Sequence, residues 1–326
     1  MMSCTVCERI YRIGFLPVLG GLNAQSSAAV ASAMKVGGID VVDIPFDGKS
    51  AEATIREIAH KCEGVVVGAS GVKTADQCAK AVEAGAQFVM TVGVDAECIR
   101  ICQEQDVAMI PQCKDVSEVK AAQSAGVKVV NLVYQDFGCD MEALKKMAPS
   151  FVDMKFILSL GEDASQMQLC LSAPFTYAVR GSWISPKKEL EPHEYASVTM
   201  ACEEMRTAVF DFTMYHIGIN TENADAACCV CDMLNDAFRF KLRDNGPSSR
   251  FAGIGIEVMK RIYRGQHGHF AVRTNNVDRA IIYLKEKGYE MDWDTVYYAD
   301  GRIYTIYLKE EHSFGGFAVH LLQKAF

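Results

Sequence analysis

Two segments near the C-terminal end of the 326-residue sequence repeat each other, and each begins with a histidine. HIGINTENADAA, starting at His216, aligns without gaps to HFAVRTNNVDRA, starting at His269, and five of the twelve positions are identical. Each copy has the pattern of a strand followed by a helix. A later apolar strand follows each copy, GIEVMK around Glu257 and FAVHLLQ around His320. Such an internal repeat indicates two related modules in which these residues occupy matching positions.

Strand parity places these four side chains on one face of the expected sheet. Successive strand residues point to opposite sides, and apolar residues alternate with each His or Glu position. A lone strand histidine is more often structural than a ligand, but four ligand-type residues at matching positions favour metal binding. Three imidazoles and one carboxylate suit zinc, nickel, cobalt, manganese or iron better than calcium or magnesium. The sequence therefore predicts a divalent metal site formed by His216, Glu257, His269 and His320, and no organic cofactor.

Arg273 follows on the same expected face, two residues beyond Ala271 and four beyond His269. A guanidinium in that place could hold the carboxylate of a substrate through paired hydrogen bonds. Open coordination positions on the ion would let it polarise adjacent substrate oxygens or acidify a bound water. Arg273 is therefore a candidate catalytic residue.

Before this region, from residue 14 onward, short apolar runs alternate with amphipathic segments. The runs are FLPVLGG, IDVVDIPF, GVVVGAS, AQFVMTVG, VAMIP, VKVVNLV, MKFILSL and FTYAVRG. Strands that alternate with helices pair in parallel. Eight such units in about 200 residues fit a (β/α)8 TIM barrel better than an open doubly wound sheet, and no G-x-G-x-x-G motif follows the first strand. We expect this α/β barrel to span residues 1–209.

In such barrels the functional residues lie where the strands end. Polar or glycine residues occupy these positions in most of the expected strands. They are Asp43, Asp47, Ser70, Gly71, Gln112, Asn131, Ser159, Gly161, Gly181 and Ser182.

The barrel segment resembles the 2-keto-3-deoxy-6-phosphogluconate (KDPG) and 2-keto-4-hydroxyglutarate (KHG) aldolases. The matching stretches include LPVLGG, GGIDVVDIPF, EAGAQFVMTVG, MIPQCKDVSEV, MKFILSLGED and VRGSWISP. The resemblance implies a TIM barrel that cleaves small 2-keto acids through a lysine Schiff base, with a carboxylate that moves protons. It also implies a homo-oligomer, by family analogy a trimer.

Several site positions depart from this family. The family's lysine aligns with Asn131, and an amide cannot form an imine. Its glutamate base aligns with Asp43, a shorter acid that could still act, and its carboxylate-binding arginine aligns with Asp47, which reverses the charge. The phosphate-binding run becomes 158–161 (LSLG), and Arg180 replaces a glycine of the last strand. The resemblance therefore implies a degenerate aldolase pocket.

Residues 210–326 resemble a second group, the vicinal oxygen chelate superfamily, which includes glyoxalase I. The resemblance rests on the two histidine repeats and on the later strands around Glu257 and His320. It implies an α+β domain of paired βαβββ modules that form a cup, with metal ligands on the first and last strand of each module. The last ligand is commonly glutamate in that superfamily, so His320 departs from the pattern but can still ligate.

Composition limits the partners. The formal net charge is −8 and no basic run occurs, which argues against nucleic acid. No apolar stretch approaches the roughly 20 residues that span a bilayer. The N-terminus lacks the apolar core of a signal peptide, so we expect a cytoplasmic protein whose 13 cysteines are reduced. The C-x-x-C pair Cys4 and Cys7, and the cluster Cys228, Cys229 and Cys231, are interpreted as structural.

The leading functional hypothesis is a lyase or isomerase that acts on a small 2-keto or 2-hydroxy acid at the C-terminal metal site. One alternative is an aldolase that uses another lysine near a strand end, with Lys73, Lys114 and Lys128 as candidates. The other alternative is a scaffold that binds a sugar acid without catalysis.

Overall fold

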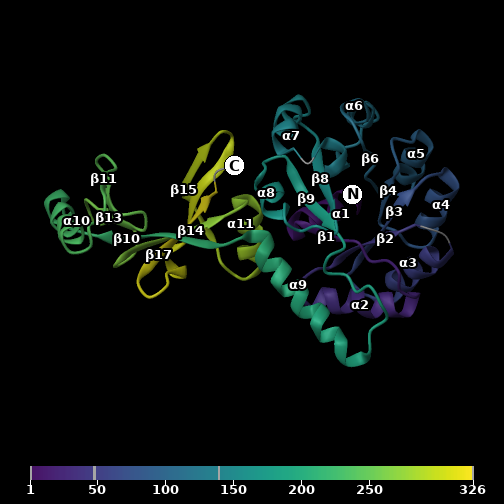
Figure 1. Ribbon diagram of the computed structural model, residues 1–326, viewed down its shortest axis with the longest axis horizontal. Coiled ribbons are helices and arrows are strands. Elements are labelled where there is room, and N and C mark those ends of the chain that lie inside the picture. Colours follow the sequence, from purple (N-terminus) through teal and green to yellow (C-terminus); the bar gives the residue numbers. More distant parts are fainter. Residues whose placement is uncertain (1, 47–48, 139, 325–326) are drawn as a thin grey trace. The chain divides into compact units, whose positions relative to one another are not determined.

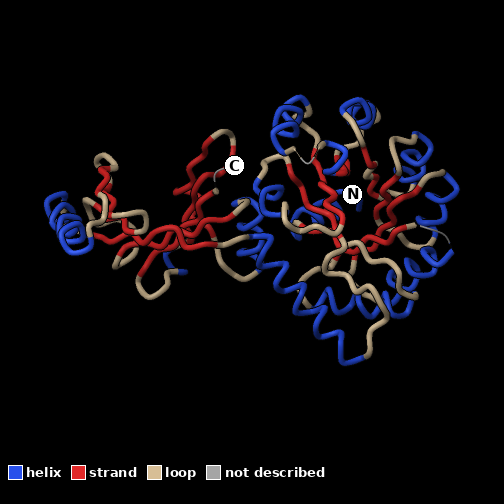
Figure 2. Tube along the Cα trace, viewed as in Figure 1, coloured by secondary structure: helices blue, strands red, loops and turns tan. Residues whose placement is uncertain are grey.

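The computed structural model describes residues 2–46, 49–138 and 140–324. The chain divides into two compact units, with the division between Val209 and Phe210. Helices surround the strands of the first unit, whereas strands dominate the second (Figures 1 and 2). Over the described ranges, no helix combines the length and the apolar character needed to cross a membrane.

The strands of the first unit form a parallel barrel. They are β1 (Phe15–Pro17), β2 (Val41–Pro45), β3 (Val66–Val72), β4 (Phe88–Thr91), β5 (Ala108–Met109), β6 (Gln112–Cys113), β7 (Val129–Val133), β8 (Lys155–Gly161) and β9 (Thr176–Gly181). They pair in the orders β1-β9-β8-β7-β6 and β2-β3-β4-β5. Parallel bridges from Val18 to Asp43 and from Val92 to Gln112 join the two groups. The strands therefore close into a ring.

The fifth strand of the barrel differs from the sequence prediction because it is interrupted. We expected one strand over 107–111, but β5 pairs with β4 and β6 pairs with β7, and residues 110 and 111 lie between them. Pro111 has no N–H group to donate to a neighbouring strand. Its carbonyl still accepts from the backbone N–H of Asn131 at 2.9 Å. The interruption therefore leaves eight strand positions around the barrel.

Helix α1 precedes the first strand, and the other helices follow strands of the barrel. They are α1 (Met2–Ile13), α2 (Ala24–Val36), α3 (Lys49–Lys61), α4 (Ala75–Glu83), α5 (Ala96–Glu104), α6 (Val116–Ser124), α7 (Met141–Met147), α8 (Met167–Ser172) and α9 (Tyr195–Phe210). Short 3-10 helices occur at η1 (Tyr134–Phe137), η2 (Ala148–Ser150) and η3 (Pro192–Glu194). Gly38, Gly85 and Gly126 lie just after helices and have positive φ angles. Glycine adopts this conformation more readily than other residues. Apolar residues of strands and helices form one continuous core.

The second unit repeats one order of elements. The first module contains β10 (Thr213–Asn220), α10 (Ala224–Phe238), β11 (Leu242–Asp244), β12 (Ser249–Ala252) and β13 (Ile256–Met259). The second contains β14 (Gly268–Thr274), α11 (Val277–Glu286), β15 (Met291–Ala299), β16 (Arg302–Leu308), η4 (Glu310–His312) and β17 (Phe317–Gln323). The strands form one mixed sheet in the order β11-β12-β13-β10-β14-β17-β16-β15. The order of strands outward from the centre is thus the same in both modules.

The two modules meet at the antiparallel pair β10 and β14. His216 lies opposite Ala271, and Gly218 lies opposite His269. Because Gly218 and Ala271 occupy matching positions of the repeat, this register relates the modules by an approximate two-fold axis. The axis brings the first histidine of each module to the centre of the sheet.

Each helix of the second unit packs on one side of its own module. Ala227 and Cys231 of α10 join Val258 in one buried cluster, and α11 joins strands of the second module in another. Ile217, which we expected to pack on the helices, is 38% exposed. Neither buried cluster of the second unit includes it.

Candidate metal centre and altered barrel site

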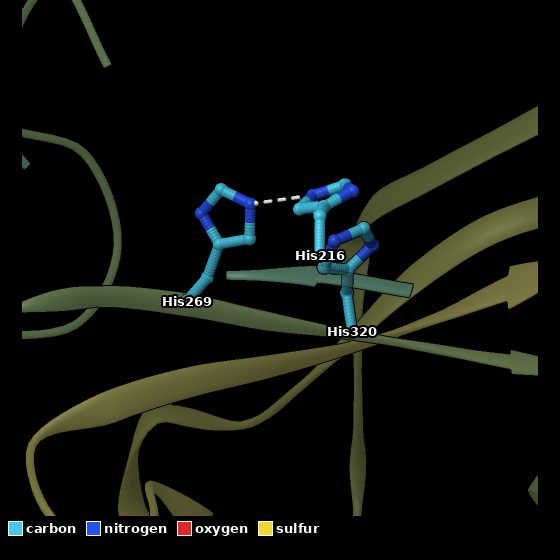
Figure 3. A group of neighbouring side chains, drawn as sticks. All are labelled: His216, His269 and His320. Atoms are coloured by element: carbon cyan, nitrogen blue, oxygen red, sulfur yellow. Dashed lines mark hydrogen bonds between the residues drawn. The ribbon is translucent and has the colours of Figure 1, made fainter. Parts of the chain in front are cut away.

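Three histidines from three adjacent strands converge on the sheet face opposite the helices. His216 comes from β10, His269 from β14 and His320 from β17, and all three are buried (Figure 3). The Nε2 atoms of His216 and His269 lie 3.1 Å apart. One possible ligand nitrogen from each ring lies within 4.8 Å of the other two. The structure therefore brings together three of the residues that the sequence analysis singled out.

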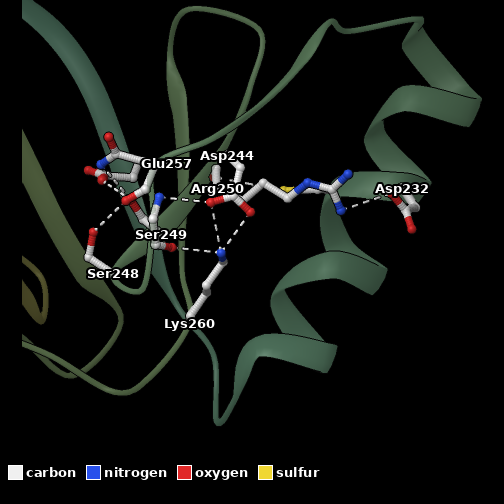
Figure 4. Close-up of polar contacts among 10 residues, drawn as sticks. Asp232, Asp244, Ser248, Ser249, Arg250, Glu257 and Lys260 are labelled. Carbon is white, nitrogen blue, oxygen red and sulfur yellow. Dashed lines mark hydrogen bonds and ion pairs between the residues drawn. The ribbon is translucent and has the colours of Figure 1, made fainter.

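Glu257 of β13 joins this cluster. Its Oε2 atom lies 3.0 Å from Nε2 of His216 and 3.3 Å from Nε2 of His269. The Ser249 hydroxyl donates to the other carboxylate oxygen, Oε1 (Figure 4). Burial alone would raise the pKa of Glu257, but hydrogen bonds from the two histidines and from Ser249 outweigh it and hold the pKa well below its usual range. Glu257 is therefore an anion at neutral pH.

His320 is held as the tautomer that can ligate a cation through Nε2. The Thr305 hydroxyl donates its one proton to the Leu321 carbonyl at 2.8 Å. The contact of 2.8 Å between Thr305 Oγ1 and His320 Nδ1 must then be donated by His320. Burial, followed by the charges of His269 and His216, lowers the pKa of His320 to about 3. Its Nε2 therefore carries a lone pair, and this buried atom has no hydrogen-bond partner among the described residues.

Register explains why the four side chains meet. Glu257 pairs with Gly218 across β13 and β10, and His320 pairs with Ala271 across β17 and β14. A Cβ atom at position 218 would lie 2.0 Å from Cε1 of His269. The missing side chain thus leaves the space that the imidazole occupies.

These atoms fit a divalent ion of the kind expected from the sequence. Nitrogen and carboxylate oxygen donors suit zinc and related transition metals. Bare acceptor atoms that face one another in a buried site are unfavourable unless a proton or a cation lies between them. His216, His269, His320 and Glu257 could therefore hold such an ion, while Ser249 and Thr305 orient two of them. Sequence analysis did not identify Ser249 or Thr305, because a hydroxyl on a neighbouring strand gives no signal by spacing.

Aromatic rings flank the cluster at matching positions of the two modules. Phe251 pairs with Glu257, and Tyr307 pairs with His320. The Tyr307 ring stacks on His320 with 4.7 Å between centroids, and Phe251 meets His216 edge to face at 5.6 Å. The rings exclude water from two sides, which strengthens electrostatic interactions at the cluster.

Arg273 lies close to this cluster but does not join it. Its guanidinium carbon is 3.2 Å from the centroid of the Tyr215 ring, and that ring is 5.2 Å from the ring of His216. The buried Nε of Arg273 has no hydrogen-bond partner among the described residues. A cation over an aromatic ring is favourable, and the guanidinium is left with N–H groups that an anion can accept.

In the barrel, one arginine ties together the ends of four strands. Arg180 of β9 donates from Nε to Asp43 Oδ2 of β2 at 2.7 Å, and its terminal nitrogen lies 2.6 Å from the same oxygen. It also donates to Ser70 of β3 at 2.9 Å and to Ser159 of β8 at 3.3 Å. Asp43 is fully buried and Arg180 is 18% exposed. The guanidinium thus occupies the interior of the barrel at the level of the expected site.

Most of the other predicted barrel residues lie at or just beyond the carboxyl ends of their strands. Ser159 donates to the buried Asn131 of β7 at 2.7 Å, and Gln112 pairs with Asn131 across β6 and β7. Gly71 and Gly161 are exposed and have positive φ angles. The backbone N–H of Ser182 donates to Gly161, while a Cβ at Gly181 would overlap the Trp183 ring. Asp47 lies outside the described residues.

The sequence of the barrel matches a known family of aldolases. A family model for KDPG and KHG aldolases matches residues 6–201, more than half of the chain. The chain belongs to the KDPG and KHG aldolase family. The KHG/KDPG aldolase of Escherichia coli K12 is 26% identical over 201 residues, which cover 61% of this chain and 94% of the relative. The 2-dehydro-3-deoxy-phosphogluconate aldolase of Treponema pallidum is 24% identical over 200 residues, covering 61% and 95%.

Solved aldolase structures confirm the barrel fold of the first unit. The 2-keto-3-deoxy-6-phosphogluconate aldolase of Zymomonas mobilis ZM4, crystallised with 3-phosphoglycerate, has a TM-score of 0.56 at 24% identity and covers 61% of this chain and 94% of its own. The KDPG aldolase of Legionella pneumophila, with pyruvate captured as a covalent carbinolamine intermediate, has a TM-score of 0.55 at 22% identity and covers 61% and 97%. The family match ends at residue 201, before the second unit begins.

Within this aldolase domain, none of the three lysines named as alternative nucleophiles is buried. Such a lysine must be desolvated so that its amine is neutral. Lys73 and Lys114 are exposed, and no lysine is buried among the residues that the structure describes. Lys128 comes directly before β7 and therefore lies at the amino end of that strand, away from the carboxyl ends where the functional residues of such barrels lie.

Proposed function

We propose that the second unit is a metal-dependent lyase or isomerase module of the vicinal oxygen chelate type, and that its substrate is a small 2-keto or 2-hydroxy acid. The observation that carries the proposal is the convergence of His216, Glu257, His269 and His320 from equivalent strands of two βαβββ modules. If each histidine had an unrelated structural role, a two-fold arrangement would not be expected. Here the first and last strands of both modules each carry a possible ligand. The element order of both modules also agrees with the resemblance described for residues 210–326.

The chain's own residues would divide the work at this site. When bound, a divalent ion supplies positive charge that stabilises an enolate oxygen as it forms. His216, Glu257, His269 and His320 would hold such an ion. Arg273 binds the carboxylate of the acid and fixes its orientation. Isomerisation, epimerisation and carbon–carbon cleavage all pass through such an enolate.

We infer further that the barrel no longer performs Schiff-base chemistry. The position that we align with the family's lysine is Asn131, and the pocket interior contains the ion pair of Arg180 and Asp43. Because the Asp43 carboxylate is bound by the Arg180 guanidinium, it is poorly placed to accept or donate a substrate proton. The barrel then serves as a scaffold, and a trimeric assembly stays a prediction from the family resemblance.

The experiment that tests the metal centre is metal analysis of protein purified without a histidine tag and reconstituted with zinc. We expect one zinc ion per chain in the wild type and a loss of bound zinc in His216→Ala and His269→Ala. His267→Ala is the matched control, because His267 is exposed and directly precedes β14. Substoichiometric zinc in the wild type, or equal loss in the control, contradicts the proposal.

A further inference from the structure

The two modules supply unequal charge at their matching last strands. The last strand of the first module carries a carboxyl group, Glu257 of β13, and the equivalent residue of β17 is His320. In place of a second carboxylate, the second module therefore contributes an imidazole whose Nδ1–H is donated to Thr305 and whose Nε2 is free to ligate. Metal-bound imidazoles are neutral. The inference drawn from this difference rests on the proposed metal centre. It concerns the charge of the substrate that the centre would bind.

The charge that remains at the site is positive. Glu257 is the one carboxylate within the cluster of ligand atoms among the described residues, so a divalent ion held there keeps a net positive charge. A second carboxylate in place of His320 would cancel that charge. The choice of residue at position 320 thus determines whether the centre attracts anions.

Nearby arginines add to this positive charge. Arg273 lies over Tyr215 and has no carboxylate partner in the described part of the chain. The Arg243 guanidinium lies 4.6 Å from the centroid of Phe251, the ring that contacts His216. Arg264 lies over Tyr307 but is paired with Asp292 at 2.8 Å. Arg273 therefore offers uncompensated charge beside the cluster, whereas the charge of Arg264 is neutralised.

We propose that His320 is a specificity-determining residue that makes the centre select small dianions with two adjacent oxygen atoms over neutral compounds of the same shape. The enolate form of a 2-keto acid is such a dianion. The centre would stabilise this enolate by charge complementarity, and Arg273 would add positive charge for its carboxylate. A ligand set with two carboxylates would lack this preference.

The test compares His320→Glu with His320→Gln, because the two side chains have nearly the same shape and differ by one unit of charge. The wild type and both variants are loaded with zinc, desalted and analysed for metal. Oxalate, a dianion with adjacent oxygens, and glycolamide, a neutral compound with adjacent oxygens, are then titrated by calorimetry. Arg273→Gln provides a variant that alters charge without touching the proposed ligands.

We expect oxalate to bind the Glu variant at least tenfold more weakly than the Gln variant, which corresponds to about 1.4 kcal/mol, while glycolamide binds both equally. We also expect Arg273→Gln to weaken oxalate without loss of zinc. Equal affinity of the Glu and Gln variants for oxalate, or an undiminished affinity in Arg273→Gln, overturns the charge-selection proposal and leaves the metal centre standing. Failure of the wild type to retain zinc overturns both.

Discussion

Gly218 and His269 lie opposite each other on the two central strands of the second unit, and the imidazole of His269 fills the space that a side chain at position 218 would need. A Cβ there would come within 2.5 Å of three ring atoms. Backbone atoms of a central strand cannot move away easily, so the ring must move instead. The orientation of one proposed ligand thus depends on a glycine of the other module.

Gly218→Ala should therefore impair metal binding and cost stability. Overpacking of this kind costs about 1–3 kcal/mol, and we expect zinc affinity to fall at least tenfold because His269 is displaced. Gly255→Ala is the matched control, since nothing lies within 4 Å of a Cβ at that position. Competition with a chelating dye measures the affinity. Unchanged zinc affinity in Gly218→Ala would show that the ring position is irrelevant to binding.

Thr305→Val should weaken metal binding with little change in packing volume. The variant removes the oxygen that accepts from His320 Nδ1 at 2.8 Å and so releases the ring tautomer. Loss of such a supporting contact typically lowers metal affinity about 10–100-fold. Thr305→Ser retains the hydroxyl and should restore most of the affinity. If Ser and Val variants bind zinc equally, the hydroxyl does not position His320.

That His216, Glu257, His269 and His320 lie together on one face could be predicted from the sequence, because strand parity and the repeat act together. Residues such as His216 and Glu257 alternate with apolar neighbours, and this alternation alone fixes the face on which they lie. The partners Ser249 and Thr305 could not be predicted, since pairing between strands of one module depends on register. Register is a property of the folded sheet and leaves no periodic signal in these short strands.

In the barrel, the strand ends were predictable but the ion pair was not. Alternation of strands and helices placed Asp43 and Ser159 at the carboxyl ends of their strands. The sequence identified Arg180 only as a replacement for a glycine of the family. It does not show whether such a long side chain points into the barrel or away from it. Likewise, the interruption of the fifth strand at Pro111 depends on whether a neighbouring strand has a carbonyl facing that residue, which cannot donate a hydrogen bond to it.

Arg180→Met should destabilise the barrel. Removing the arginine leaves the carboxylate of Asp43 fully buried without its charged partner, and breaking a buried pair in this way costs about 3–5 kcal/mol. The double variant with Asp43→Asn should recover much of this loss. Arg100→Met removes only exposed ion pairs with Glu97 and Glu104, so it should change stability by at most about 1 kcal/mol.

Urea unfolding of these variants in a Trp293→Phe background measures the differences, because the tryptophan fluorescence then comes from Trp183 in the barrel. The single Arg180 variant should be less stable than the double variant. The opposite order, or an Arg180 variant as stable as the wild type, would mean that the ion pair contributes nothing to the fold.

Treatment with pyruvate and borohydride should leave the protein unmodified. Reduction traps an imine between a lysine and a keto acid, and we expect none because Lys73 and Lys114 are exposed and Asn131 has no amine. Intact-mass spectrometry detects the adduct, with the KHG/KDPG aldolase of Escherichia coli as positive control. A stable adduct on any barrel lysine would restore the aldolase alternative.

Anomalous X-ray scattering from crystals of the zinc-loaded protein tests the central claim most directly. We expect one anomalous peak in the second unit, about 2.0–2.2 Å from donor atoms of His216, His269, His320 and Glu257. The peak should vanish in His216→Ala crystals grown in the same way and persist in His267→Ala. A peak elsewhere on the chain, or no peak in wild-type crystals that contain zinc in the buffer, contradicts the account.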